Sequence, residues 1–506
     1  MVNKIDSNSV GLAIAEEVIG SPKTLPGTPI WRSLLPNDYG DFGVKTKQVA
    51  RDPITSDRQK RRSVITDVDA SASFPIDLTQ EGLNRLWRGA LFSTFYEKAD
   101  TAPIDGTAIT ITSATSTTYT AASGLTVFNA NDLIYASGFT NAANNGLKLL
   151  SASASGSVTT TGNVSEASPP AASRLQKVGY QFASGDATMT VTSGVATLGA
   201  TAKDLTTLGL NVGEWIFIGG DAAGSFFGTC PTGYARILSI SATAIVFDKV
   251  TAAFVTDTGS GKTIRIFFGK FLKNEQNSAN IITRLYQLER QLGNDGSGIQ
   301  SEYIRGAVVN EVGLTIPQGD KITADFNFVA TDGEYRTGSQ GVKSGTRVAD
   351  LNEKAFNSSS HVYRFKMNII DATTLQPSAL FAYILSGSLS IKNNASLSKA
   401  VGVTGGFDIN VGSLDVSGEL NPYFTNTSAI SSIRNNPDVT IDLILTQSNA
   451  GLILDLPLIS LSTGAIEVKK DDSIKMKLNH MACTGANGYT VSYTNFAYLP
   501  TAAMSS

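Results

Sequence analysis

The fold is decided by the stretch Ile304-Arg-Gly-Ala-Val-Val-Asn-Glu-Val-Gly-Leu-Thr-Ile316 and its continuation Lys321-Ile-Thr-Ala-Asp-Phe-Asn-Phe-Val-Ala330. Apolar residues alternate with polar ones in both, which predicts strands that are buried on one face. Pro317-Gln-Gly-Asp320 between them predicts a turn, so the two stretches form an antiparallel pair. Further strands are predicted over residues 386–392, 405–411, 414–420, 439–445, 474–478 and 489–493, which makes residues 271–506 largely antiparallel β structure.

The first hundred residues predict another strand pair and one helix. The strands are expected over 44–51 and 64–76, with Pro75 closing the second, and the polar excursion 52–62 is too long for a tight turn. Thr79 is the expected helix cap. The apolar face of that helix is predicted from the spacing of Leu83, Leu86, Trp87, Ala90 and Leu91.

Residues 101–270 repeat themselves. Residues 131–138 resemble 213–220, and residues 145–154 resemble 233–242, an alignment that places Lys148 beside Arg236. Charges are sparse there, while small and β-branched residues are frequent, which is typical of all-β structure. The repeat predicts two copies of a small β-barrel or sandwich module, over residues 101–180 and 181–270.

Composition excludes several classes of protein. The 506 residues carry a formal net charge of −3, and 16% are charged, against about 25% in a typical soluble protein. A near-neutral chain argues against a generally basic nucleic-acid binder. We expect neither a membrane-spanning helix nor a secretion signal, and therefore synthesis in the cytoplasm. Cys230 and Cys483 stand alone, so no disulfide framework or zinc site is indicated.

Catalytic and ligand-binding motifs are largely missing. Gly259-Ser-Gly-Lys-Thr263 resembles the end of a phosphate-binding loop, but Thr256 replaces the required glycine and a strand-like stretch follows, so we interpret it as a hairpin turn. His361 and His480 lack metal-ligand neighbours. The acidic pairs Asp67/Asp69 and Asp471/Asp472 are interpreted as solvated loop charges. The sequence therefore predicts no enzyme, no cofactor and no metal site.

One dense basic cluster lies in the excursion between the first two strands. It consists of Arg58, Lys60, Arg61 and Arg62. Such a cluster either contacts an acidic neighbour or nucleic acid, or keeps a loop soluble. The absence of interleaved aromatic residues weakens the nucleic-acid interpretation.

Several of these stretches together resemble the major tail tube proteins of long-tailed, siphovirus-type bacteriophages. The resemblance rests on pattern rather than on one short motif. It includes the opening around residues 11–19 and 28–32, the segment from Arg51 to the helix, and the central strands. It also includes residues 390–418 and the ending Phe496-Ala-Tyr-Leu-Pro500. It covers the first and third parts of the chain and leaves residues 101–270 as an insertion.

The resemblance implies a β-sandwich tail-tube core, formed by residues 1–100 and 271–506 with a flanking short helix. Subunits of that family join their long strands into rings, and stacked rings form the tube through which double-stranded DNA passes without specific binding. The resemblance also implies the virion tail as location, and the tape measure, tail terminator and distal tail proteins as partners. The excursion is then expected to reach a neighbouring subunit or ring, with Arg51, Arg58, Lys60, Arg61 and Arg62 as contact residues.

Two questions stay open at this level. The order strand, excursion, strand and short helix of the first hundred residues occurs again in residues 389–394, 395–402, 414–423 and 428–434. This repeat suggests a duplicated core. A duplicated core predicts three chains in a ring of pseudo-six-fold symmetry, and a single core predicts six chains. The inserted modules are expected to be surface decoration. The alternative functions are a phage decoration or baseplate protein and an all-β surface adhesin.

Overall fold

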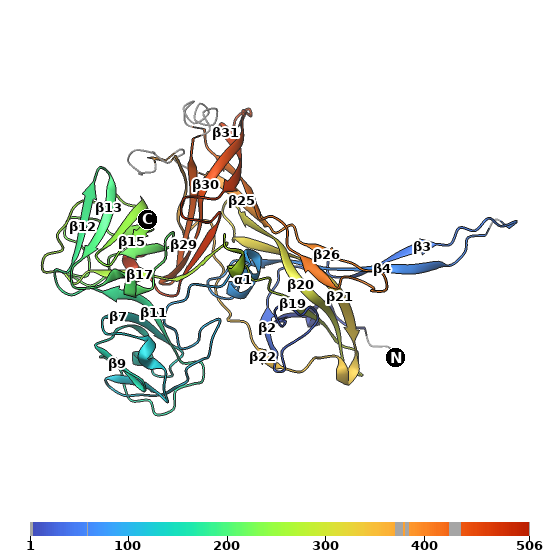
Figure 1. The fold of residues 1–506 in the computed structure, drawn as a ribbon, viewed down its shortest axis with the longest axis horizontal. Coiled ribbons are helices and arrows are strands. Elements are labelled where there is room, and N and C mark those ends of the chain that lie inside the picture. The colour runs from blue at the N-terminus through green and yellow to red at the C-terminus, as the bar shows by residue number, and fades with distance from the viewer. Residues whose placement is uncertain (1–3, 58, 370–377, 380–383, 425–436, 505–506) are drawn as a thin grey trace. The chain divides into compact units, whose positions relative to one another are not determined.

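The computed structural model describes residues 4–57, 59–369, 378–379, 384–424 and 437–504. The chain is mainly β and divides into two compact units (Figure 1). Unit 1 comprises Met1–Ser93, Glu275–Ala355 and Ser386–Glu419, and unit 2 comprises the remaining segments. The predicted β class is therefore confirmed, while the boundaries of the inserted modules stay predictions.

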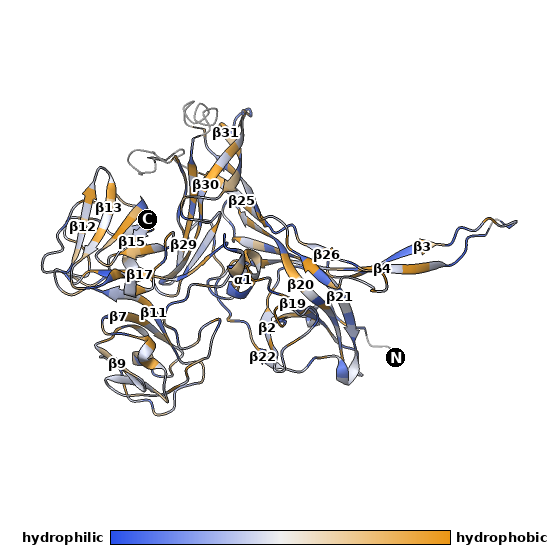
Figure 2. Cartoon of the chain, viewed as in Figure 1, coloured by the Kyte–Doolittle hydropathy of each residue, from blue (hydrophilic) through white to orange (hydrophobic). Residues whose placement is uncertain are grey.

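The sheet of unit 1 is built on the predicted central strand pair. β20 (Ile299–Ile316) and β21 (Thr323–Arg336) are antiparallel, from Thr315 opposite Thr323 to Ser301 opposite Arg336. Hydrophobic and hydrophilic residues alternate along both strands (Figure 2). The sheet continues through β19 (Tyr286–Asn294), β1 (Gly11–Glu16), β2 (Ile30–Leu34) and the short β22 (Thr346–Val348).

The two N-terminal strands also form as predicted. β3 (Gly43–Ala50) and β4 (Ser63–Asp77) are antiparallel, and β4 pairs with β21 through its second half. Pro75 does not close the strand, contrary to the prediction, since β4 continues to Asp77. The ladder with β3 stops at Ser71, and on that side of β4 only an isolated bridge from Pro36 to Ile76 lies further along. Pro75 therefore lies on an edge where its missing N–H breaks no strand ladder.

The predicted helix forms but begins later than expected. α1 spans Asn84–Leu91, and Thr79 does not cap it. The carboxylate of Glu353 instead accepts hydrogen bonds from the backbone N–H groups of Glu81 (2.9 Å) and Gly82 (2.9 Å). Trp87 is buried and packs edge-on against Phe326. None of the described helices is long and apolar enough to cross a membrane.

A later segment adds to unit 1. β25 (Ile384–Lys392) pairs with the C-terminal part of β20, and a small hairpin follows, formed by β26 (Ser396–Ser398) and β27 (Asp408–Asn410). β28 (Asp415–Pro422) comes next. The strand predicted over 405–411 is thus shorter than expected, and the short helix predicted over 428–434 lies outside the described residues.

Residues 101–270 lie in unit 2 and form two sheets. One has the order β5-β6-β10-β9, and the other has the order β12-β13-β16-β15-β14-β17-β11-β7-β8, so the strands of both predicted modules share the larger sheet. Each module nevertheless has a separate cluster of buried apolar residues. The bounds of these strands are β5 Ile111–Ala114, β6 Thr118–Ala121, β7 Asp132–Ser137, β8 Gly146–Leu149, β9 Ala152–Ala154, β10 Ser157–Thr159, β11 Arg174–Gln181, β12 Ala187–Thr192, β13 Val195–Ala200, β14 Trp215–Ile218, β15 Gly233–Ile240, β16 Ala244–Val250 and β17 Arg265–Phe268.

The sequence repeat is matched in structure at its acidic residue but not at its basic one. Asp132 begins β7 and accepts a hydrogen bond from the N–H of Asn129, and Glu214 precedes β14 and accepts one from Asn211. Lys148 lies opposite the second residue after Asp132, whereas Arg236 lies opposite the first residue after Glu214. The alignment of the two bases is therefore wrong by one position, which in a strand places them on opposite faces.

The C-terminal strands complete unit 2. β29 (Val439–Gln447) pairs with β30 (Ala450–Glu467), which also pairs with β31 (Lys475–Cys483) and β32 (Ser492–Phe496). The strand predicted over 489–493 thus lies slightly later. The remaining strands are β18 (Lys270–Lys273), β23 (Val362–Ile369) and β24 (Ser378–Ala379).

Candidate functional site

The outer parts of β3 and β4 form a two-stranded arm that projects from unit 1 (Figure 1). Apolar side chains of the arm are left open, since Val49, Val64 and Ile65 are 53%, 56% and 57% exposed. In the described part of the chain, β3 pairs with no strand other than β4, so beyond Val44, whose N–H bonds to the Tyr335 hydroxyl, the outer edge of β3 carries unpaired backbone groups. Such an edge is suited to pairing with another chain.

The basic cluster lies at the tip of this arm. Arg51, Lys60 and Arg62 are exposed, and none of them makes an ion pair with the described residues. Arg61 pairs with Asp57 at 2.7 Å, a local contact that the sequence did not predict. Arg58 lies outside the described residues. The predicted contact of these five residues with a neighbouring subunit or ring stays a prediction.

A second arm is formed by β25, β28 and the β26–β27 hairpin, and the loop of that hairpin contacts β4. Lys399 contacts both Asp67 and Asp69, and its hydrogen bond lowers the pKa of Asp67. The N–H of Gly406 donates to the carbonyl of Thr331 on β21 at 3.0 Å. Asp67 and Asp69 are therefore not loop charges, contrary to the prediction, because both lie on β4 and pair with Lys399, while Asp69 stays solvated with 60% of its side chain exposed.

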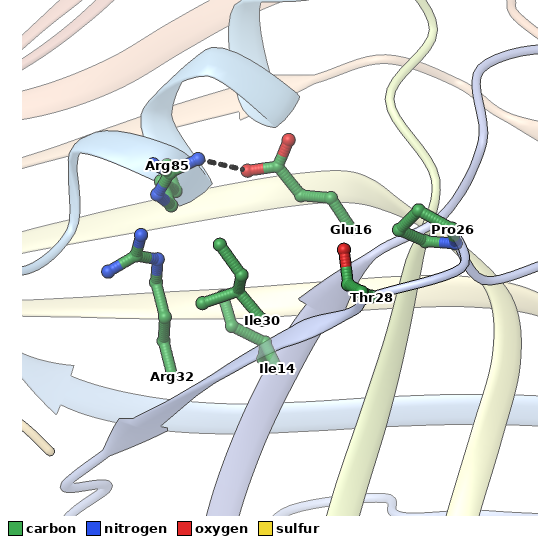
Figure 3. A pocket seen from close by; sticks show the side chains of 7 residues that line it. All are labelled: Ile14, Glu16, Pro26, Thr28, Ile30, Arg32 and Arg85. Carbon is green, nitrogen blue, oxygen red and sulfur yellow. Dashed lines mark hydrogen bonds and ion pairs between the residues drawn. The ribbon is translucent and has the colours of Figure 1, made fainter. Parts of the chain in front are cut away.

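A small pocket of about 180 Å³ lies beside β1 and β2 in unit 1 (Figure 3). Its floor is apolar, and one wall places Glu16 between Arg85 (2.9 Å) and Arg88 (2.6 Å). Burial acts to raise the pKa of Glu16, but the two guanidinium groups outweigh it and hold that pKa below its ordinary value. Burial, with the nearby Arg85, lowers the pKa of Arg32 to about 10. The pocket is thus a structural cluster of charges, in which the Glu16 carboxylate is held by arginines and no His or Cys lines the wall beside the Thr28 hydroxyl.

Buried charges join the inserted strands to the C-terminal strands within unit 2. Lys249 on β16 pairs with Asp442 on β29, and neither side chain is exposed. Arg236 on β15 pairs with Asp455 on β30 at 3.0 Å. Burial acts to raise the pKa of Asp442, but Lys249 and Arg364 outweigh it and lower that pKa. These pairs connect segments far apart in sequence, so no local pattern predicts them.

Two sequence features that were considered as binding motifs can be located in the described structure. Residues 259–263 form a turn that leads into β17, with no helix after it, so the phosphate-loop interpretation has no support. His480 is buried, and His361 accepts a hydrogen bond from the N–H of Asn357. Within the described ranges, no group of three His, Cys, Asp or Glu side chains is arranged to hold a metal ion.

The family model described as phage tail tube protein matches residues 237–494, just over half of the chain. This chain belongs to the phage tail tube protein family. The match includes the central pair β20–β21 and the C-terminal strands, and the arm formed by β3 and β4 lies before it. No curated protein matches the chain.

Family membership confirms the resemblance seen in the sequence and gives the tail tube protein a structural role. It implies self-assembly into a tube, a place in the virion tail, and a protein that is not an enzyme. The open edge of β3 and the exposed apolar residues of the arm are then candidate assembly surfaces.

Proposed function

We propose that this protein forms rings of three chains with pseudo-six-fold symmetry, which stack into the phage tail tube and conduct the genome into the host cell. The observation that carries the proposal is a repeated order of strand pairing within one chain. It favours three chains over six, because each chain then supplies two equivalent sets of strands.

The first set lies in unit 1 and pairs in the order β1–β19–β20–β21–β4–β3. A second set follows the same order through β23–β29–β30–β31. It continues to β28, whose next residue, Tyr423, bridges Lys475 at the start of β31. Asn394, just after β25, donates to Asp415 of β28, so β25 takes the place of β3. The strands also occur in the same order along the chain.

The irregularities of the two sets coincide as well. The β20–β21 ladder has a bulge between Val309 and Glu311, and the β30–β31 ladder has one between Leu461 and Thr463, each 152 positions later. A second bulge lies on β20 between Ile304 and Ala307, and its counterpart on β30 lies between Leu456 and Ile459, again 152 positions later. Because bulges are specific features of a ladder, two matched bulges support a duplicated core.

The charge of the chain suits a conduit for DNA. Neutralising phosphates with Lys and Arg would retain the duplex, whereas a net charge of −3 does not favour such retention. We expect DNA to pass without specific binding and the lumen to be poor in positive charge. The tape measure, tail terminator and distal tail proteins are the partners expected from the family resemblance. The inserted modules are expected to decorate the outer surface.

Electron microscopy of the purified protein at high concentration, together with native mass spectrometry, tests this proposal. We expect rings with the mass of three chains, and hollow tubes with a bore of about 20 Å or more, wide enough for a duplex. Rings of six chains would overturn the stoichiometry. Discrete trimers that never stack and have no bore would favour a decoration protein instead.

A further inference from the structure

We propose that β3 of one copy pairs antiparallel with the open edge of β30 of a second copy, with Lys45 opposite Ala465. The occupant of each edge is therefore another copy of this chain. The inference rests on the proposed self-assembly and adds the strands and the register that would join the subunits.

The pairing of β25 with β20 provides the intramolecular precedent. It runs antiparallel from Glu311 opposite Lys392 to Ile316 opposite Gly387. Lys392 lies 3.4 Å from Glu311, whose carboxylate also accepts a hydrogen bond from Ser390. On the side of β20 that faces away from β21, β19 pairs with the first half of the strand and β25 pairs with the second half. One set thus already receives the arm of the other.

The corresponding edge of β30 is open as far as the described residues show. β29 pairs with β30 as far as Ile459, and β31 occupies the other side up to Glu467. Among the described residues, no strand takes over from β29 beside residues 460–467. Ile466 and Val468 are 44% and 72% exposed at this end. Among the described residues, the place that β25 fills beside β20 is therefore unfilled beside β30.

β3 matches this open edge of β30 in its position in the chain order, its unpaired edge and its positive charge. It is equivalent to β25 in chain order, and its outer edge is open in the described structure. Lys45 and Lys47 are exposed on it, although the ammonium group of Lys45 also contacts Asp41. Glu467 lies at the end of the open β30 edge and is half exposed, although its carboxylate also lies 3.5 Å from the ammonium group of Lys469. Opposite charges on the two edges favour their pairing.

The register follows from the two equivalences. The bulges that match β20 to β30 place Ala465 where Gly313 stands, and Gly313 lies opposite Ser390. In β25, Leu389 faces the core and Ser390 follows it outward. In β3, Val44 packs close to Gly333 and Lys45 follows it outward. Facing alone allows Lys45 or Lys47, and we place Lys45, the outward residue next to Val44, where Ser390 stands, opposite Ala465.

Disulfide trapping tests the proposal. The double variant Lys45→Cys, Ala465→Cys is made in a Cys483→Ser background, assembled, oxidised and analysed on a non-reducing gel. We expect a ladder of crosslinked chains that ends at three. Thr46→Cys with Ala465→Cys is the matched control, since a shift of one residue turns the side chain to the other face. Lys45→Cys with Thr190→Cys, on the exposed part of β12, controls for random collision.

A charge exchange supplies a second measurement in case the cysteine variants do not fold. Glu467→Lys should raise the concentration for half-maximal assembly roughly 2–5-fold, and adding Lys45→Glu and Lys47→Glu should restore it. If tubes form and neither crosslinking nor charge rescue is seen, the edge pairing is wrong while the proposed function stands. Crosslinking of the Thr46→Cys control in place of the Lys45→Cys variant would overturn the register. Failure of the unsubstituted protein to form rings or tubes would count against the proposed function itself.

Discussion

His480 on β31 is buried, and neither of its ring nitrogens has a hydrogen-bond partner in the described structure. Burial lowers the pKa of this imidazole from 6.5 to about 4. The unfolded chain therefore binds more protons than the folded chain between these two values, and stability rises with pH across that window. The histidine destabilises the fold below about pH 6.5 and ceases to do so above it.

We expect the free energy of unfolding to fall by about 2 kcal/mol between pH 7.5 and pH 5 because of His480. Urea denaturation of wild type and His480→Gln at both pH values measures this difference, and the variant should lose most of it. His361→Gln is the matched control, because His361 is the other imidazole of the chain and accepts a backbone hydrogen bond. An unchanged pH dependence in His480→Gln would contradict the assignment.

Single residues also show where sequence reasoning stops. The alternation around β20 and β21 was sufficient to predict both strands, because each residue's face depends on its immediate neighbours. The pair formed by Lys249 and Asp442 was not predictable, because it joins strands separated by almost two hundred residues. Thr79 failed as a helix cap for a similar reason, since Glu353, distant in sequence, serves the helix start instead.

The arm is the element whose function depends most on other copies. Its strands were predicted from local alternation, but the role of its tip needs a neighbour that one chain cannot supply. Arg51, Lys60 and Arg62 are exposed and without an ion pair among the described residues. Stacking of rings offers such cations a partner, in keeping with the predicted contact role.

We expect replacement of Arg58, Lys60, Arg61 and Arg62 by Gln to leave rings intact and to shorten the tubes. Replacement by Glu should have a larger effect. Because exposed charges are screened over about 10 Å at 0.1 M salt and about 3 Å at 1 M, tubes of the wild type should shorten at high salt, while those of the Gln variant should change little. Tube length is measured by negative-stain microscopy. Tubes of unchanged length in both variants would show that these charges only keep the loop soluble and do not set the stacking of the rings.

At the scale of the whole molecule, the inserted strands are part of unit 2. Their sequence predicted separate decorating modules, because the composition changes sharply at about residue 101. Yet a single apolar cluster contains Trp215 and Tyr234 from the insertion together with Phe496 and Leu499 from the C-terminal end. The hydroxyl group of Tyr234 donates to the carbonyl of Ala503 at 3.1 Å. Composition reveals a boundary in sequence, but it does not reveal which surfaces pack together.

This shared core predicts that the second inserted module and the C-terminal strands unfold together. Leu499→Ala removes a fully buried side chain and should cost about 2–5 kcal/mol. Trp215 reports on the insertion when Trp31 and Trp87 are replaced by Phe, since the chain has three tryptophans. The fluorescence transition of Trp215 in urea should then shift to lower concentration in Leu499→Ala. Leu12→Ala, a buried position of β1 in unit 1, is the control and should leave that transition in place. If Leu499→Ala lowers the stability of the C-terminal strands by circular dichroism while the Trp215 transition stays unchanged, the insertion folds independently, and its contacts with Leu499 do not couple the two parts.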